Sequence, residues 1–263
     1  MLNQKVIELL SEVNKNIDLT DELQTEIHPE VFFKRNSVNV LIGKKGSGKT
    51  YNVFREVLKL KFVDNHRYTK MLYVTNKPYD PTYSRMKNLL PITVEKVPYE
   101  KAVEKIQELS EAKNAIAQIH EENLQVEELD TTRLDKVLGE EVKQEDQVYH
   151  SIVLLDDCAF LFEHRTPSNA ALWRLLFENR QPKITYFLTM QDAKGLDTSI
   201  KEAVDTFWLF GGYTEHKFQY LMRSIPHETE IKGIWLIYAK LTKNQALVFF
   251  NTSTGTEMMV LKC

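Results

Sequence analysis

Three glycines and a lysine–threonine pair follow a short apolar run near the beginning of the chain. Residues 39–50 read NVLIGKKGSGKT, and Gly43, Gly48, Lys49 and Thr50 have the spacing G-x-x-x-x-G-K-T of a phosphate-binding loop. Glycine loses more conformational freedom on folding than any other residue, so glycines this dense indicate a backbone that must turn tightly. Such a turn directs backbone N–H groups toward phosphate oxygens. The motif therefore predicts binding of a nucleoside triphosphate.

The flanking residues and the side chains of the loop agree with this prediction. An apolar run precedes the loop and a helical pattern follows it from Tyr51, an order that points a helix N-terminus at an anion. Lys49 would reach the β- and γ-phosphates, and the Thr50 hydroxyl would ligate Mg²⁺. The predicted nucleotide-binding residues are Gly43, Lys44, Gly46, Ser47, Gly48, Lys49 and Thr50.

Two aspartates end a second apolar run, HSIVLLDD at 150–157. The carboxyl end of a buried strand faces the ligand in an open α/β sheet, so Asp156 is placed to hold Mg²⁺ together with Thr50. Side chains alternate along a strand, so Asp157 would point elsewhere and could polarise the attacking water. A plain acidic turn after a buried strand is the other interpretation.

A third run, ITYFLTMQ at 184–191, ends at Gln191. Adjacent parallel strands end together, so Gln191 would approach the γ-phosphate and orient the attacking water or sense loss of the phosphate. Arg180 lies just before this run, in ENRQPK, where a guanidinium could serve as an arginine finger. Alternatively, Arg180 forms an ion pair with Glu178 or another acid. Arg174 lies in a helical pattern and is expected to be solvated.

The elements that must position these residues alternate along the chain. Strand-like runs occur at 38–42, 70–75, 151–156, 184–190 and 206–210, and helical patterns occur at 51–62, 170–178 and 199–204. This alternation predicts an α/β fold, a mostly parallel sheet flanked by helices. Two further runs, at 233–239 and 246–251, flank Lys243-Asn244 and predict a C-terminal β-hairpin.

The charge of the chain is unevenly distributed. Residues 95–146 carry 15 acidic and 7 basic residues, a net charge of −8 against −3 for all 263 residues, so the rest carries +5. The segment from about 98 to 147 has helical spacing and predicts an acidic helical insertion. It could be a lid over the nucleotide, a partner-binding arm, or a solvated helical hairpin packed on the core. We expect one domain over residues 1–263, beginning with an amphipathic helix at about 3–15.

The composition excludes several classes of protein. Cys158 and Cys263 are the only cysteines in the sequence, so the cysteine pattern indicates neither a disulfide framework nor a zinc site. No apolar run is long enough to cross a membrane, and the beginning of the chain lacks the features of a signal peptide. We expect a soluble, intracellular protein without a membrane segment.

The combination of GKKGSGKT, SIVLLDD and ENRQPKITYFLTMQDAKGLDTSIKEAVDTFWLFGG resembles the FtsK/HerA-type genome packaging ATPases. The likeness is greatest to the poxvirus-like form found in large DNA viruses and virophages. It covers residues 37 to about 212. In two places the sequence departs from the family pattern: Gln181-Pro182 follows Arg180 where the family usually has His, and Asp157 stands where many relatives have Glu.

The resemblance implies a P-loop NTPase with a RecA-like core, a homo-oligomeric ring, ATP hydrolysis with Mg²⁺, and translocation of double-stranded DNA into a viral capsid. By this likeness Asp156 binds Mg²⁺, Asp157 activates water, Gln191 is the sensor and Arg180 acts on the neighbouring subunit's nucleotide, while Lys49 binds the phosphates. The implied partners are DNA, further copies of the chain, and a capsid or portal-vertex protein. The implied location is the host cytoplasm, a viral factory or the virion.

Two other functions are compatible with the phosphate-binding loop. Small nucleoside or nucleotide kinases share the loop and a small α/β body, but they usually carry an arginine-rich lid, whereas the insertion here is acidic with Arg133 as its only arginine. A regulatory switch could keep the loop and both aspartates without doing work. Lys77, Arg85 and Lys87, on the loop after the second strand, are candidate DNA contacts or solvated basic residues.

Overall fold

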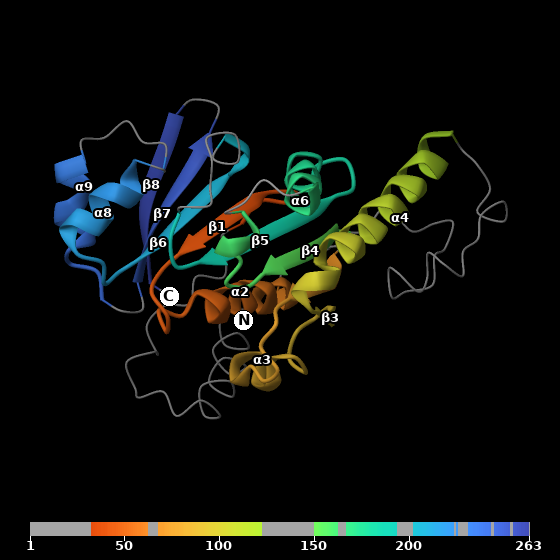
Figure 1. The fold of residues 1–263 in the computed structure, drawn as a ribbon, viewed down its shortest axis with the longest axis horizontal. Helices are drawn as coiled ribbons and strands as arrows, with labels where there is room; N and C mark the ends of the chain where they lie inside the picture. The colour runs from red at the N-terminus through yellow and green to blue at the C-terminus, as the bar shows by residue number, and fades with distance from the viewer. Residues whose placement is uncertain are drawn as a thin grey trace.

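The computed structural model describes residues 33–62, 68–122, 150–162, 167–193, 202–223, 225, 231–242, 245–252 and 255–262 (Figure 1). Within these ranges the helices pack on one sheet of eight strands, in the order β3-β2-β4-β5-β1-β6-β7-β8. The strands are β1 (Val38–Ile42), β2 (Tyr68–Val74), β3 (Thr93–Val97), β4 (His150–Leu155), β5 (Ile184–Met190), β6 (Thr206–Phe210), β7 (Gln245–Thr252) and β8 (Gly255–Lys262).

Strands β1 to β6 are parallel to one another, and β7 is antiparallel to both of its neighbours, β6 and β8. All residues of β1, β4, β5 and β6 are buried. Strands covered on both faces read as continuous apolar runs, which is why these four were recognisable in the sequence. The parallel arrangement puts the carboxyl ends of β2, β4, β5, β1 and β6 side by side, and the predicted loop, Asp156, Asp157 and Gln191 follow directly after three of these ends.

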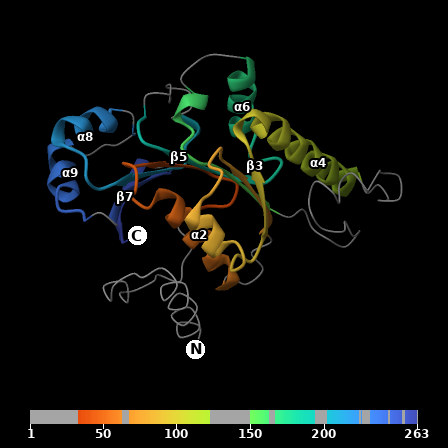
Figure 2. The same cartoon turned by 60° about the horizontal axis from the view of Figure 1, so that its bottom comes forward.

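Helices cover both faces of the sheet. Figure 2 shows α4, α6 and α8 on one side and α2 on the other. The α-helices are α2 (Lys49–Lys59), α3 (Pro81–Met86), α4 (Ala102–Glu122), α6 (Pro167–Phe177), α8 (Glu215–Met222) and α9 (Ile231–Tyr238). Short 3-10 helices are η2 (Leu60–Phe62), η3 (Tyr99–Lys101) and η5 (Ala159–Leu161).

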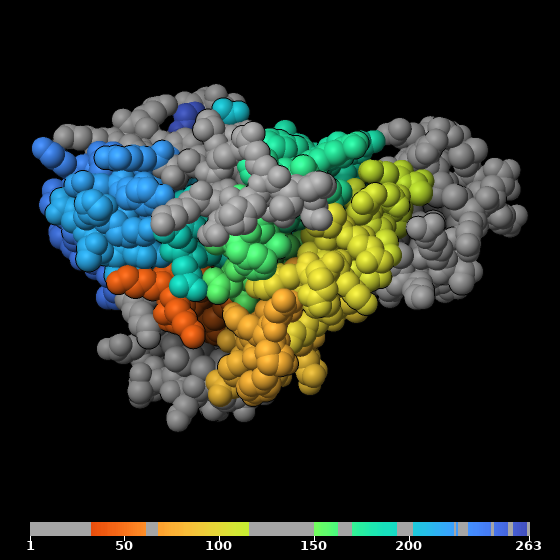
Figure 3. Space-filling model, viewed as in Figure 1, coloured from red at the N-terminus to blue at the C-terminus, as the bar shows by residue number. Residues whose placement is uncertain are grey.

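The two faces hold separate hydrophobic cores. Alternate residues of β1 divide between them: Val38, Val40 and Ile42 pack with α4, α6, α8 and α9, whereas Leu41 packs with α2 and α3. Fully burying an aliphatic side chain of this size contributes about 1.5–3 kcal/mol. On the face seen in Figure 3, α4 lies at the surface beside α6. Packing on both faces stabilises the sheet, and it thereby fixes the relative positions of the carboxyl ends of the strands.

The apolar run at 233–239 is not a strand, and this part of the hairpin prediction was wrong. The run lies mostly within α9, where Ile234 and Tyr238, four residues apart, are buried while Leu236 is 66% exposed. A short apolar run cannot be assigned to helix or strand from periodicity alone, and packing against α8 favoured the helix. The hairpin itself exists. Its strands are β7, which contains the predicted run 246–251, and β8.

The other predicted elements divide into three groups. The five predicted strands of the parallel sheet and the helices after the loop and at 170–178 are confirmed. The strands β3 and β8 and the helices α3 and α8 were not predicted; β3, for example, has only five residues of mixed polarity, TVEKV. The predicted N-terminal helix at 3–15, most of the helix at 199–204, the turn 243–244 and the insertion beyond α4 lie outside the described residues. The single-domain prediction for the whole chain stays a prediction.

Candidate nucleotide and metal site

The phosphate-binding loop connects β1 to α2 and needs its glycines for two different reasons. Gly46 and Gly48 have φ angles of 76° and 88°, a region in which a side chain is strained. Gly43 has no room for a side chain, since an added Cβ would lie 2.4 Å from Ser47 Oγ and 2.8 Å from Phe210 Cβ. The loop therefore folds as a tight turn that ends at the N-terminus of α2, where backbone N–H groups are available to an anion.

Lys49 is the first residue of α2 and is buried within the loop. Its ammonium donates to Gly43 O at 2.6 Å and to Lys44 O at 3.0 Å. Burial lowers the pKa of Lys49, and the negative charges of Asp157 and Asp156 oppose that shift. The ammonium thus lies between the loop and the two aspartates, the position from which it would contact phosphate oxygens.

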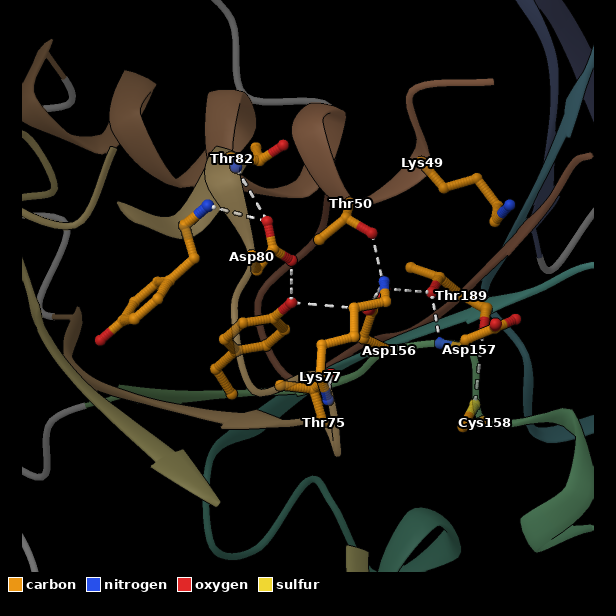
Figure 4. A network of polar contacts seen from close by, with 12 residues as sticks. Lys49, Thr50, Thr75, Lys77, Asp80, Thr82, Asp156, Asp157, Cys158 and Thr189 are labelled. Atoms are coloured by element: carbon orange, nitrogen blue, oxygen red, sulfur yellow. Dashed lines mark hydrogen bonds and ion pairs between the residues drawn. The ribbon is translucent and has the colours of Figure 1, made fainter. Parts of the chain in front are cut away.

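Asp156 follows β4 and is the most heavily bonded acid of the site. Thr50 Oγ1 donates to Asp156 Oδ1 at 2.5 Å, and Thr189 Oγ1 donates to the same oxygen at 2.9 Å. Lys77 Nζ lies 2.5 Å from Asp156 Oδ2. Figure 4 shows these side chains converging on Asp156 from α2, from β5 and from the loop after β2. Asp156 is buried, so its charge depends on these partners.

Two tyrosines support Asp156 from the side of β2 and β3. Tyr73 donates to Asp80 Oδ2 at 2.5 Å and lies 3.4 Å from Asp156 Oδ2, and Tyr99 donates to the backbone oxygen of Asp156. Burial, and after it the charge of Asp156, raises the pKa of both Tyr73 and Tyr99. Both phenols therefore stay protonated and act as hydrogen-bond donors.

The oxygens of Thr50 and Asp156 fit a magnesium ion. Mg²⁺ prefers oxygen ligands and, in nucleotide sites, takes one or two protein groups together with substrate phosphates and water. A hydroxyl and a carboxylate oxygen already in contact provide such a pair, beside the phosphate-binding loop. Among the described residues no group of three or more His, Cys, Asp or Glu could hold a metal without a substrate.

Asp157 and Gln191 meet at the ends of β4 and β5. Gln191 Nε2 donates to Asp157 Oδ1 at 3.2 Å and to Oδ2 at 3.1 Å, and Thr189 Oγ1 accepts from Asp157 N at 2.8 Å. Asp157 has a φ of 54°, a conformation that residues other than glycine rarely adopt. This backbone turns its carboxylate away from Asp156 and toward Gln191. The chain thus separates an acid that can hold a metal from one that can accept a proton.

Gln191 is connected in turn to the region after β6. Tyr213 donates to the backbone oxygen of Gln191 at 2.7 Å, and Lys44 Nζ lies 5.7 Å from the centre of the Tyr213 ring. Tyr238 on α9 accepts from Tyr213 N at 3.1 Å. Burial raises the pKa of Tyr213, so the phenol remains a donor. The end of β5 is therefore held by the phosphate-binding loop and by α9.

Arg180 is not part of this cluster. It lies before β5, at the amino end of the parallel strands, with 81% of its side chain exposed and its guanidinium 3.9 Å from Asp205 Oδ1. Glu178 pairs instead with Arg174. The seven residues of β5, at a rise of about 3.3 Å each, put roughly 20 Å between Arg180 and the loop of its own chain. Arg180 therefore cannot contact a nucleotide bound to that loop.

Two residues of the site escaped the sequence analysis. Thr189 is a hydroxyl in an otherwise mostly apolar buried run, two positions before Gln191, and that position was the available signal. Lys77 was considered as a DNA contact or a solvated basic residue, whereas the structure places its ammonium on Asp156. The hydrogen bond and charge of Asp156 outweigh the effect of burial and raise the pKa of Lys77. Arg85 and Lys87 are exposed.

Several solved structures have a similar fold. B204, the DNA-packaging ATPase from Sulfolobus turreted icosahedral virus, aligns at a TM-score of 0.56 and 15% identity, over 86% of this chain and 98% of that chain. B204 from Sulfolobus turreted icosahedral virus 2, in complex with ATP-gammaS, aligns at 0.52 and 14%, over 90% and 100%. ATPases 2 and 3 of EssC from Geobacillus thermodenitrificans align at 0.56 and 16%, over 86% and 39%. No protein-family profile and no curated protein sequence matches the chain.

At these identities the similarity concerns the fold. It confirms the predicted α/β fold with its mostly parallel sheet flanked by helices. It also confirms, for the fold, the resemblance to genome packaging ATPases that the motifs indicated.

Proposed function

We propose that this chain is an ATP-hydrolysing motor that moves double-stranded DNA into a viral capsid. One observation carries the proposal. The phosphate-binding loop, the buried Asp156 and the Asp157–Gln191 pair lie together at the carboxyl ends of adjacent strands. The fold supports the packaging role, since the similar structures include packaging ATPases, one of them in complex with an ATP analogue.

In this proposal the loop binds the triphosphate through backbone N–H groups from Gly43 to Thr50, and the Lys49 ammonium leaves its carbonyl partners to neutralise the β- and γ-phosphates. Thr50 and Asp156 would hold Mg²⁺. Held there, Mg²⁺ would supply positive charge that offsets the negative charge developing on the phosphate oxygens. Asp156 is already oriented by Thr50 and Thr189, so little reorganisation is needed to present its carboxylate.

Asp157 is the proposed general base. Its carboxylate accepts a proton from the attacking water, and Gln191 holds that carboxylate in position through its amide N–H groups. Gln191 would also register loss of the γ-phosphate, because its backbone is tied to Tyr213 and, through Tyr213, to α9. A hydrolytic role explains why two acids with different partners follow one strand.

Arg180 is the proposed arginine finger for a neighbouring subunit in a ring. Its own loop is out of reach, its side chain is exposed, and its contact with Asp205 is long. A guanidinium that lies at the amino end of one sheet can meet the carboxyl end of the next sheet in a head-to-tail ring. The proposed partners are accordingly double-stranded DNA, further copies of this chain, and a capsid or portal-vertex protein.

The proposed setting is the host cytoplasm or a viral factory, or the virion. Within the described residues no helix combines the length and apolar character needed to cross a membrane. A nucleotide kinase and a regulatory switch remain the rival functions. The Asp157–Gln191 pair favours hydrolysis over both, because it places a proton acceptor beside a water-orienting amide.

The test is ATP turnover by the purified chain without DNA, with single-stranded DNA and with duplex DNA, using Lys49→Ala to define the background. We expect turnover that duplex DNA stimulates. Phosphate transfer to a nucleoside or nucleotide acceptor would establish a kinase instead. Nucleotide binding without turnover under any of the three conditions would favour the switch.

A further inference from the structure

Lys77 is the one lysine that the structure places on the proposed metal ligand. It lies in the loop between β2 and α3, and its Nζ is 2.5 Å from Asp156 Oδ2. The two partners differ in environment, since 46% of the Lys77 side chain is exposed against 2% for Asp156. The ammonium therefore reaches into the site from solvent, whereas the carboxylate stays inside.

The hydrogen-bond partners of the Asp156 carboxylate differ in whether they can stay in place when a cation binds that carboxylate. Thr50 and Thr189 bond Oδ1 through hydroxyls, which can rotate and offer a lone pair to the cation. An ammonium has donors only and carries a positive charge of its own. Lys77 and a divalent cation thus repel each other at this carboxylate, and one must move for the other to bind.

The loop is built so that only the side chain of Lys77 has to move. Asn76 Oδ1 accepts from Tyr99 N at 2.7 Å. Lys96 Nζ donates to the backbone oxygen of Lys77 and, at 3.3 Å, to that of Pro78. These bonds fix the backbone without using the Lys77 ammonium. Because 46% of the Lys77 side chain is exposed, the ammonium can swing out into solvent.

We propose that Lys77 is an internal counter-ion that competes with Mg²⁺ for Asp156, so that binding of the metal–nucleotide complex releases the Lys77 side chain from the carboxylate. The inference rests on the proposed function, because it takes Asp156 as a metal ligand. In this role Lys77 is a positioning residue. It keeps the buried carboxylate charged and oriented, and it sets the Mg²⁺ concentration at which nucleotide binds.

The experiment is a Mg²⁺ titration of the binding of a fluorescent, non-hydrolysable ATP analogue, measured by anisotropy. Lys77→Met removes the competing charge and should lower the half-saturating Mg²⁺ concentration by roughly five- to a hundredfold, the usual range of coupling between two binding events. Lys77→Arg keeps the charge and should stay within about threefold of the wild type, well below that range. Lys101→Met is the matched control, since it removes an exposed charge from η3, next to the same loop, without touching Asp156 or the backbone of Lys77.

A second readout covers the case in which Lys77→Met folds poorly. Without its counter-ion the buried Asp156 carboxylate destabilises the fold, and Mg²⁺ with the analogue should raise the melting temperature of this variant more than that of the wild type. An unchanged Mg²⁺ requirement for Lys77→Met, or an equal shift for Lys101→Met, would overturn the inference while leaving the nucleotide site intact. If the wild type fails to bind the analogue at any Mg²⁺ concentration, the proposed function itself is wrong.

Discussion

The two ends of the parallel strands are organised in opposite ways. At the carboxyl end, Asp156 is buried and bonded by two hydroxyls and an ammonium, and Asp157 is held by Gln191. At the amino end lies Arg180, the arginine that the sequence analysis selected. Its side chain is 81% exposed, and its guanidinium is 3.9 Å from Asp205 Oδ1. The acids at the carboxyl end are held by residues of the same chain, whereas Arg180 lacks a strong partner among the described residues.

The contact of Arg180 is secondary even for its partner. Asp205 Oδ2 accepts from Val38 N at 2.8 Å and thereby holds the beginning of β1, a structural role that does not involve Arg180. An exposed ion pair of this length contributes about 0–1 kcal/mol. The difference between the two ends indicates that the proposed nucleotide site is preorganised within one chain, whereas the proposed role of Arg180 requires a partner from another molecule.

The largest effect is expected at the carboxyl end. Lys49→Ala should reduce ATP turnover to background while the chain remains folded, because it removes the charge that meets the β- and γ-phosphates and leaves the glycine turn unchanged. Phosphate release measured beside circular dichroism checks this. Lys61→Ala, at an exposed position beyond α2, is the matched control and should keep wild-type turnover. Undiminished hydrolysis by folded Lys49→Ala would remove the basis for the site.

The second prediction concerns the amino end. Arg180→Ala should bind ATP normally but hydrolyse it about a thousandfold or more slowly, the loss typical of a missing arginine finger. Arg174→Ala, which removes an exposed arginine paired with Glu178, is the control and should have little effect. Turnover of the wild type should also rise with protein concentration, since only assembled subunits have complete sites.

Mixing decides whether Arg180 acts on a neighbour. Lys49→Ala and Arg180→Ala are each inactive in this proposal, yet some contacts in a mixed ring combine an intact loop with an intact arginine. The mixture should therefore regain part of the activity. Absence of recovery, with co-assembly demonstrated by light scattering or cross-linking, would make the two ends of the sheet independent and leave Arg180 as a surface residue.

The third prediction separates the two aspartates. Asp157→Asn should lower turnover by roughly a hundredfold or more while nucleotide and Mg²⁺ still bind, because the amide cannot accept a proton from water. Asp156→Asn should weaken the Mg²⁺ dependence of binding instead. Equilibrium binding of a labelled analogue at several Mg²⁺ concentrations, beside single-turnover hydrolysis, measures both. If the two variants exchange these patterns, the roles of the two acids must be exchanged as well.

The smallest effect concerns stability. Gly43→Ala forces a methyl group against Ser47 and Phe210 and should cost about 1–3 kcal/mol of unfolding free energy, as overpacking does. Gly233→Ala is the matched control, since nothing lies within 4 Å of its added methyl group and alanine favours a helix. Chemical denaturation compares the two. Equal stabilities would mean that the loop yields more easily than its packing indicates.

Much of the fold was predictable because its signals are local. Continuous apolar runs identified β1, β4, β5 and β6, and the glycine spacing identified the loop between β1 and α2. The edge strand β3 and the helix α9 were not predictable in this way. A short run with mixed polarity or without clear periodicity takes its conformation from the elements against which it packs. Leu236 is exposed only because Ile234 and Tyr238 face α8 and the sheet.

The candidate site divides in the same way. The sequence by itself indicated the loop, its lysine and threonine, and the acids and amide at the strand ends, because these signals are local: a glycine spacing, and polar residues at the ends of apolar runs. Only the tertiary structure decided that Thr189 and Lys77 share Asp156, and that Arg180 lies at the opposite end from the loop. These depend on strand order: β4 lies between β2 and β5, so residues more than thirty positions apart in the chain meet at one carboxylate.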